Sequence, residues 1–173
     1  KQAIEIGRCL GIRSFALSFA NTPGDVDIFR SYIGADSTLI TKIESIQGIR
    51  NLDEITERSD AVLIDRGDLS REVPIEQIPF LQRRIVSSVK ARHTPVYVAT
   101  NLLESMVEWH QPTRAEVNDV VSTLEMGATG LVFAAETAIG DHPVAAVETI
   151  RRLIDQFDRC TPNTSFEELL FSD

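Results

Sequence analysis

The run Thr38-Leu39-Ile40-Thr41-Lys42-Ile43 is the stretch of sequence that best indicates the fold. It is short, almost continuously apolar and rich in β-branched residues, which is typical of a parallel strand buried on both faces. Other runs of this kind lie at 14–19, 61–64, 95–99 and 130–133. We expect each run to form one strand.

Amphipathic segments separate these runs, because apolar and charged residues alternate there at three- and four-residue spacing. Thr113 and Glu116 form a capping-box pattern directly after Pro112, so a helix should begin at this point. Gly127 is typical of a helix end, and Pro143 suits a first helical position. The predicted helices span 1–10, 25–33, 48–58, 74–92, 113–126 and 143–159.

Alternation of strands and helices predicts an α/β fold with a parallel sheet. The two candidate architectures are a doubly wound sheet and a piece of a TIM barrel. A doubly wound nucleotide-binding fold should carry a glycine-rich first βα turn, and the sequence contains no G-x-G-x-x-G. A whole TIM barrel needs about 250 residues, so the 173 residues here would supply only part of one.

The composition excludes two classes of function. There are 26 acidic and 17 basic residues, a net charge of −9, which argues against nucleic-acid binding. No apolar run approaches the roughly 20 residues of a membrane-spanning helix. Cys9 and Cys160 lack a paired-cysteine spacing, which predicts reduced thiols and a cytoplasmic protein.

Functional residues in α/β folds gather at the carboxyl ends of strands. The predicted ends here carry Asn21, Lys42 to Glu44, Asp65 to Asp68, Thr100-Asn101 and Glu136-Thr137. Charged groups at such positions are costly unless they are paired or bind a ligand. The sequence therefore predicts that a functional site lies at the carboxyl ends of the strands.

Each of these residues has a structural and a functional interpretation. Lys42 and Glu44 are two apart on a strand and point to the same side, so they could form a salt bridge that closes a barrel end. Asp68 could form an Asx turn after Gly67, and Glu136 is expected to hold a neighbouring loop. Alternatively, two carboxylates suit Mg²⁺ or Mn²⁺, and a lysine can stabilise a phosphoryl group or an enolate.

Five motifs containing these residues together resemble the pyruvate kinase family. They occur in family order and at family spacing between about residues 12 and 154. The motifs are Thr41-Lys42-Ile43-Glu44-Ser45-x-x-Gly48, Arg66-Gly67-Asp68-Leu69-x-x-Glu72-Val73-Pro74, Ala99-Thr100-Asn101-Leu102-Leu103-Glu104-Ser105-Met106, Pro112-Thr113-Arg114-Ala115-Glu116-Val117-x-Asp119-Val120 and Glu136-Thr137-Ala138-x-Gly140-Asp141-x-Pro143.

The resemblance implies a phosphotransferase of glycolysis that converts phosphoenolpyruvate and ADP to pyruvate and ATP. Its site would lie at the mouth of a TIM barrel. Lys42 would be the catalytic residue, and Glu44 and Asp68 would hold the divalent metal, Mg²⁺ or Mn²⁺. Lys42, Gly67, Asp68 and Thr100 would bind the substrate. No residue is assigned to the nucleotide.

The resemblance also implies how the chain is organised. Residues 1–160 would form the C-terminal part of the catalytic (β/α)8 barrel, about five βα units, and 161–173 a tail or linker. The family's first three strands, lid and regulatory domain have no counterpart here. Those parts supply the K⁺ ligands and help to close over ADP, so these residues alone should not transfer phosphate. Either the rest of the barrel belongs to the same polypeptide or another chain completes it, and a homo-oligomer is expected.

The sequence departs from the family pattern around the site. Asp65 stands where alanine is usual, and the other departures are Asn21, Ser70, Asn101 and Ala134-Ala135. Two alternatives therefore stay open. One is a metal-dependent aldolase or lyase acting on a pyruvate enolate, which needs similar chemistry. The other is a non-catalytic binding module of the same family.

Overall fold

The computed structural model of the chain describes residues 2–171. These residues divide into two compact units. The sheet unit extends to residue 101 and includes 126–132, whereas the helical unit comprises 102–125 and the residues from 133 onward. Among the described residues, none of the helices has the length and apolar character needed to cross a membrane.

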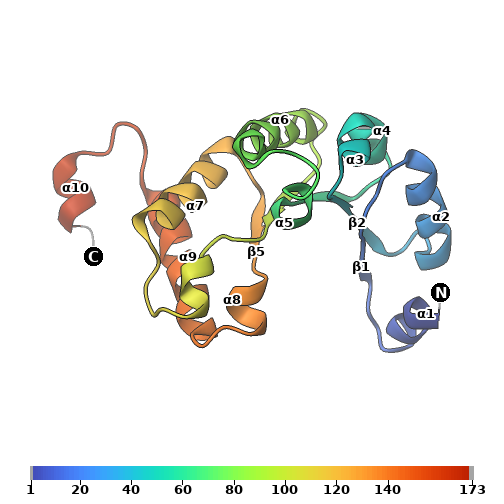
Figure 1. Cartoon of the computed structure of the whole chain (residues 1–173), viewed down its shortest axis with the longest axis horizontal. Helices are drawn as coiled ribbons and strands as arrows, with labels where there is room; N and C mark the ends of the chain where they lie inside the picture. The colour runs from blue at the N-terminus through green and yellow to red at the C-terminus, as the bar shows by residue number, and fades with distance from the viewer. Residues whose placement is uncertain (1, 172–173) are drawn as a thin grey trace. The chain divides into compact units, whose positions relative to one another are not determined.

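Five parallel strands form a single sheet in the sheet unit. Their order in space, β1-β2-β3-β4-β5, is their order in the sequence. The first two strands, β1 and β2, and the last, β5, are labelled in Figure 1. A doubly wound sheet permutes this order, whereas successive strands of a TIM barrel keep it. The predicted α/β fold is confirmed, and its topology is that of part of a barrel. The strands are Ser14–Leu17 (β1), Thr38–Ile43 (β2), Ala61–Asp65 (β3), Val96–Ala99 (β4) and Gly130–Val132 (β5).

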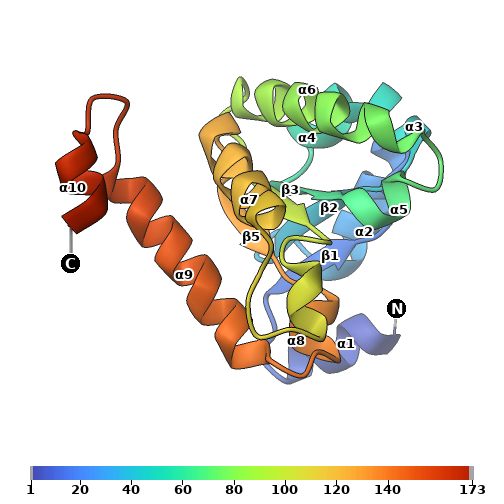
Figure 2. The same ribbon diagram turned by 60° about the vertical axis from the view of Figure 1, so that its left-hand side comes forward.

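Helices cover one face of this sheet (Figure 2). Apolar side chains of β2, β3 and β4, among them Leu39, Ile64 and Val98, form the core with residues of α2, α4 and α6. Burial of this layer is the main apolar contribution to the stability of the unit. The helices of the sheet unit are Gln2–Cys9 (α1), Pro23–Ile33 (α2), Ile46–Arg50 (α3), Leu52–Glu57 (α4), Arg66–Leu69 (α5), Ile75–Gln77 (η1, a 3-10 helix) and Ile78–Lys90 (α6).

The opposite face of the sheet is more open than the apolar runs predict. Along β2, Leu39, Thr41 and Ile43 are buried, whereas Ile40 and Lys42 on the other face are only partly buried. The expectation of burial on both faces is met by the first four residues of β3 and is wrong for β1, whose residues alternate between exposed and partly buried. The physical reason is that only the face of β1 with Phe15 and Leu17 packs against the core, and β1 is an edge strand that, in the described residues, pairs with β2 alone.

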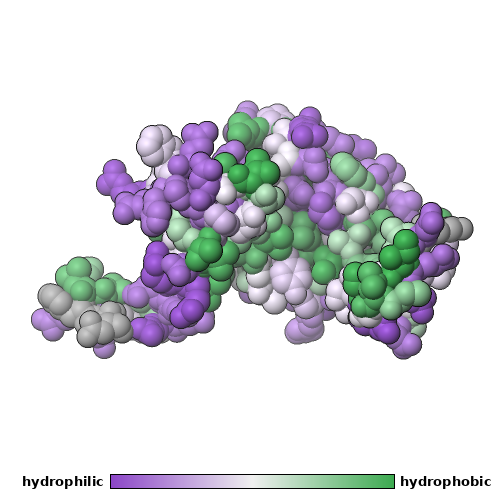
Figure 3. All heavy atoms as spheres, turned by 90° about the horizontal axis from the view of Figure 1, so that it is seen from below, coloured by the Kyte–Doolittle hydropathy of each residue, from purple (hydrophilic) through white to green (hydrophobic). Residues whose placement is uncertain are grey.

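Apolar side chains also reach the surface near the start of the chain. Ile6, Leu10 and Ile12 are each about half or more exposed. Figure 3 shows apolar surface on the face of the molecule that it draws. These residues belong to α1 and to the segment that leads into β1. The exposed edge strand and this apolar surface lie in the same part of the sheet unit.

The helical unit is built from short and long helices. The predicted capping box is present, because the Thr113 hydroxyl accepts from the Glu116 amide while the Glu116 carboxylate accepts from the Thr113 amide. The helices are Glu104–Val107 (η2), Arg114–Met126 (α7, whose last residue belongs to the sheet unit), Ala135–Ala138 (α8), Pro143–Arg159 (α9) and Phe166–Phe171 (α10). The last of these lies in the predicted tail, so that segment is not wholly irregular.

Several elements differ from the sequence predictions in detail. The helix predicted over 48–58 is two helices, α3 and α4, which meet at Asn51. The helix predicted from residue 74 opens with η1 and continues as α6. The short helices α5, η2 and α8 were not predicted, whereas α9 has the predicted bounds. Gly127 has a φ of 94°, as expected for a helix terminator.

Glu136 has the structural role expected of it. Its side chain is buried, and its carboxylate accepts hydrogen bonds from the amides of Leu102 and Leu103, both 3.1 Å, and of Ala134, 2.9 Å. A buried backbone donor without a partner costs about 1–3 kcal/mol. This one carboxylate therefore holds two loops of the helical unit together.

Replacement of Glu136 should destabilise these loops locally. We expect Glu136→Ala to lower the protection of the Leu102, Leu103 and Ala134 amides against hydrogen exchange by about tenfold or more, because all three lose their acceptor. Glu136→Gln keeps one acceptor oxygen and should have a smaller effect. Exchange measured by mass spectrometry on the full-length gene product tests this, and unchanged protection in the alanine variant would contradict it.

The hydrogen bonds of Glu116, in the helical unit, should make the stability of this unit depend on pH. Burial alone would raise the pKa of Glu116, but hydrogen bonds from Ser105 and Thr113 outweigh it and lower the pKa below 4.5. The stability that Glu116 contributes is therefore complete above about pH 4.5 and is lost as the pH falls through the lower folded-state pKa. Glu116→Gln should lower the melting temperature at pH 7 and do so less at pH 3. An equal decrease of the melting temperature at both pH values would show that the charge of Glu116 does not contribute to stability.

Candidate active site

The carboxyl ends of β2, β3 and β4 bring charged side chains together. In the parallel register Lys42 lies opposite Leu63, so Glu44 follows at the level of Asp65, and Asp65 in turn lies opposite Ala99. Lys42 and Glu44 belong to the face turned away from the covering helices. The order of the strands alone therefore places residues from three separate sequence motifs at one end of the sheet unit.

Lys42 lies between two carboxylates. Its Nζ is 2.5 Å from Glu44 Oε1 and 3.0 Å from Asp65 Oδ2. Burial alone would lower the pKa of Lys42, but the bonds to Glu44 and Asp65 outweigh burial, so the pKa lies above its ordinary value. Lys42 therefore carries a positive charge at neutral pH. The salt bridge considered from the sequence spacing is present, and Asp65 extends it.

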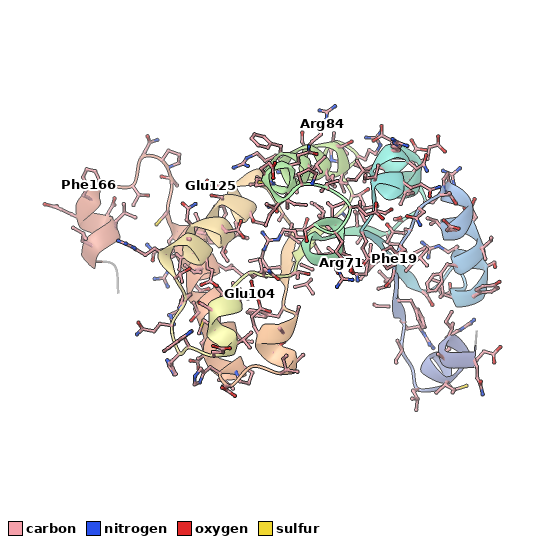
Figure 4. All side chains as sticks on the ribbon, viewed as in Figure 1. Phe19, Arg71, Arg84, Glu104, Glu125 and Phe166 are labelled. Atoms are coloured by element: carbon pink, nitrogen blue, oxygen red, sulfur yellow. The ribbon has the colours of Figure 1, made fainter. Side chains whose placement is uncertain are left out.

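Glu44 is held from a second direction. Its side chain is 1% exposed, and its Oε2 accepts a hydrogen bond of 2.5 Å from the amide of Phe19. Phe19, which is labelled in Figure 4, follows β1 and has a φ of 50°. The neighbouring Asn21 has no direct role in this group, because its side chain accepts from the Ser45 hydroxyl and so supports the start of α3.

Asp65 is the most heavily bonded carboxylate of the group. Besides its ion pair with Lys42, it accepts a hydrogen bond of 2.7 Å from the Thr100 hydroxyl and a further hydrogen bond from the Asp68 amide. Burial alone would raise the pKa of Asp65, but the bonds from Thr100 and Lys42 outweigh it, so the pKa lies below its ordinary value. Asp65 is an unusual residue for the family pattern and was not among the predicted site residues.

Gly67 and Thr100 fit closely against each other. A Cβ at position 67 would lie 2.8 Å from Thr100 Cγ2, so a larger residue would displace the threonine. Thr100 has a φ of 76°, which is strained for a β-branched residue. The Arg66 guanidinium holds this turn by donating to the carbonyl of Thr100 at 2.6 Å and to that of Asn101 at 3.0 Å. The R-G-D motif and the threonine motif thus form one local structure.

Three carboxylates could hold a metal ion at this place. One oxygen each from Glu44, Asp65 and Asp68 lies within 4.8 Å of the other two. Carboxylate oxygens are the ligands that Mg²⁺ and Mn²⁺ prefer. The residues therefore fit the divalent metal, with Asp65 next to the two predicted ligands. Asp68 also pairs at 3.3 Å with Arg71, which is exposed and labelled in Figure 4.

All the predicted site residues in the sheet unit thus come together. Lys42, Glu44 and Asp68 surround Asp65, and Thr100 and Gly67 complete the same group. Glu136 belongs to the helical unit and acts there as a structural acceptor. The signal for Asp65 was present in the sequence as a charge beside R-G-D, but spacing could not show which groups it contacts.

Comparison with known proteins agrees with these motifs. Residues 1–147 match the family model described as the pyruvate kinase barrel domain. Pyruvate kinase of Methylorubrum extorquens is 40% identical over 156 residues, which cover 90% of this chain and 33% of that protein. The enzyme of Thermotoga maritima is 38% identical over 162 residues, covering 92% of this chain and 35% of the relative.

Similarity extends to plants. The chloroplastic pyruvate kinase isozyme A of Ricinus communis is 39% identical over 153 residues, covering 86% of this chain and 26% of the relative. The chain thus spans about a third of the length of the bacterial relatives. With the barrel-type strand order and the clustered motif residues, the matched family model shows that this chain belongs to the pyruvate kinase family and covers part of its barrel domain.

Proposed function

We propose that the protein is a pyruvate kinase-like phosphotransferase, which transfers a phosphoryl group between phosphoenolpyruvate and ADP. The observation that carries the proposal is the convergence of Lys42, Glu44, Asp68 and Thr100 at the carboxyl ends of adjacent strands. Phosphoryl transfer relies almost entirely on positioning and electrostatic stabilisation. A group of fixed charges and donors is what this chemistry requires of a protein.

Lys42 would act on the transferring group. Its ammonium group is partly exposed on the open face of the sheet, and two carboxylates keep it charged. In the transition state it would face the negative charge that develops on the phosphoryl and enolate oxygens. A charge placed in advance at that point lowers the barrier of the chemical step, because it needs no rearrangement.

Thr100, Gly67 and Asp68 would bind the substrate. The Thr100 hydroxyl is a donor held in place by the Arg66 contact with its carbonyl. The amides of Gly67 and Asp68 lie in the turn that begins α5, where the absence of a side chain at position 67 allows close approach. A divalent metal bound by Glu44 and Asp68 would neutralise phosphoryl and carboxylate charge.

The first test of this proposal is metal binding. We expect Glu44→Gln and Asp68→Asn to weaken Mn²⁺ binding by the full-length gene product by more than about tenfold, because loss even of an outer-shell partner costs about 10–100-fold. Electron paramagnetic resonance titration measures this without turnover. Glu57→Gln, which alters an exposed carboxylate of α4, is the matched control. Unchanged affinity in both site variants would contradict the assignment.

The second test concerns Lys42. We expect Lys42→Met to lower kcat by about 10²–10³-fold with a much smaller change in the KM for phosphoenolpyruvate, because its charge acts mainly in the transition state. Steady-state kinetics with folded protein, checked by circular dichroism, measures the two constants. Lys90→Met is the matched control, since Lys90 is exposed at the end of α6. A defect confined to KM would mean that Lys42 only holds the substrate.

A further inference from the structure

Asp65 contacts the groups that the proposed function assigns to the substrate. Its carboxylate lies 3.0 Å from Lys42 Nζ and 2.7 Å from the Thr100 hydroxyl, and it accepts from the Asp68 amide. These three donors come from three different strand ends or loops. Each of them is also a donor that an anionic substrate would need.

The carboxylate of Asp65 also lies close to Gly67 in the R-G-D turn. Its Oδ1 lies 3.4 Å from the point where a Cβ of Gly67 would be. The carboxylate therefore covers the side of Gly67 that the missing side chain leaves open. With a side-chain exposure of 15%, it is held firmly in this place.

We propose that Asp65 is an internal competitor for the substrate, whose carboxylate occupies the donors that would bind the anionic groups of phosphoenolpyruvate. This inference rests on the proposed function. The substrate can bind Lys42 and Thr100 only if its anionic groups replace the carboxylate of Asp65 as their partner. This exchange is costly because hydrogen bonds that involve a charged group are stronger than neutral ones. Asp65 thus sets substrate affinity, and an uncharged small residue at this position would leave the donors open.

Substitution of Asp65 should therefore improve binding. We expect Asp65→Ala to lower the dissociation constant for phosphoenolpyruvate by about tenfold. This factor corresponds to about 1.4 kcal/mol, which is close to the contribution of one charge-assisted hydrogen bond. Asp65→Asn keeps the shape, removes the charge and should give a smaller gain, and it serves as the test if the alanine variant does not fold. Calorimetry on the full-length gene product with Mg²⁺ and without nucleotide measures binding in the absence of turnover.

Two controls separate this role from others. Glu57→Ala removes one negative charge from exposed α4, and the dissociation constant should change less than about twofold, since the charges are screened. Titration with Mn²⁺ alone distinguishes a competitor from a metal ligand. If Asp65 is a competitor, Asp65→Ala weakens Mn²⁺ binding by clearly less than Glu44→Gln and Asp68→Asn do, and a loss as large as theirs would make Asp65 a metal ligand and overturn the proposal.

The outcome also distinguishes the inference from the proposed function. If the wild type converts phosphoenolpyruvate but Asp65→Ala binds it no more tightly, Asp65 is not a competitor and the proposed function stands. If neither protein forms pyruvate and ATP, yet Asp65→Ala binds phosphoenolpyruvate more tightly, the proposed reaction fails and the competition by Asp65 stands. Weaker binding in both Asp65 variants would make Asp65 part of the substrate site and overturn the inference.

Discussion

The positive charge of Lys42 allows two carboxylates to lie side by side at the ends of β2 and β3. Two like charges about 4 Å apart repel by about 4 kcal/mol at an effective dielectric constant of 20. Lys42 offsets this repulsion because it pairs with Glu44 and Asp65 at once. The buried Glu44 then fixes the Phe19 amide, so the charge of one lysine helps to set the path of the chain after β1 as well.

The backbone around this charged group is held by a second set of contacts. Arg66 binds the carbonyls of Thr100 and Asn101, both of which have positive φ angles. Strain of this kind persists only where surrounding contacts maintain it. Because Arg66 and Gly67 belong to the same motif, the turn after β3 shapes the turn after β4. The position of the Thr100 hydroxyl therefore depends on the hydrogen bond from Arg66 and on the close contact with Gly67.

Long periodic segments were predictable because their signals repeat. The strand runs, the capping box at Thr113 and the helix of α9 all depend on local patterns, which tertiary contacts reinforced. Helices as short as α5 and α8, each four residues, contain too few residues to show a period. The contacts of Asp65 with Lys42 and Thr100 could not be predicted either, since Lys42 lies more than 20 positions before Asp65 and Thr100 lies 35 positions after it.

The sequential strand order has a consequence for how such a chain acquires its structure. Every strand of the sheet pairs with the strands next to it in the sequence, so no pairing has to wait for a distant segment. The connections between paired strands are 17 to 30 residues long, and the entropy lost on closing them grows only slowly with their length. Each new strand can therefore pair with the strand synthesised just before it, so the pairing order of the sheet follows the order in which the chain is made.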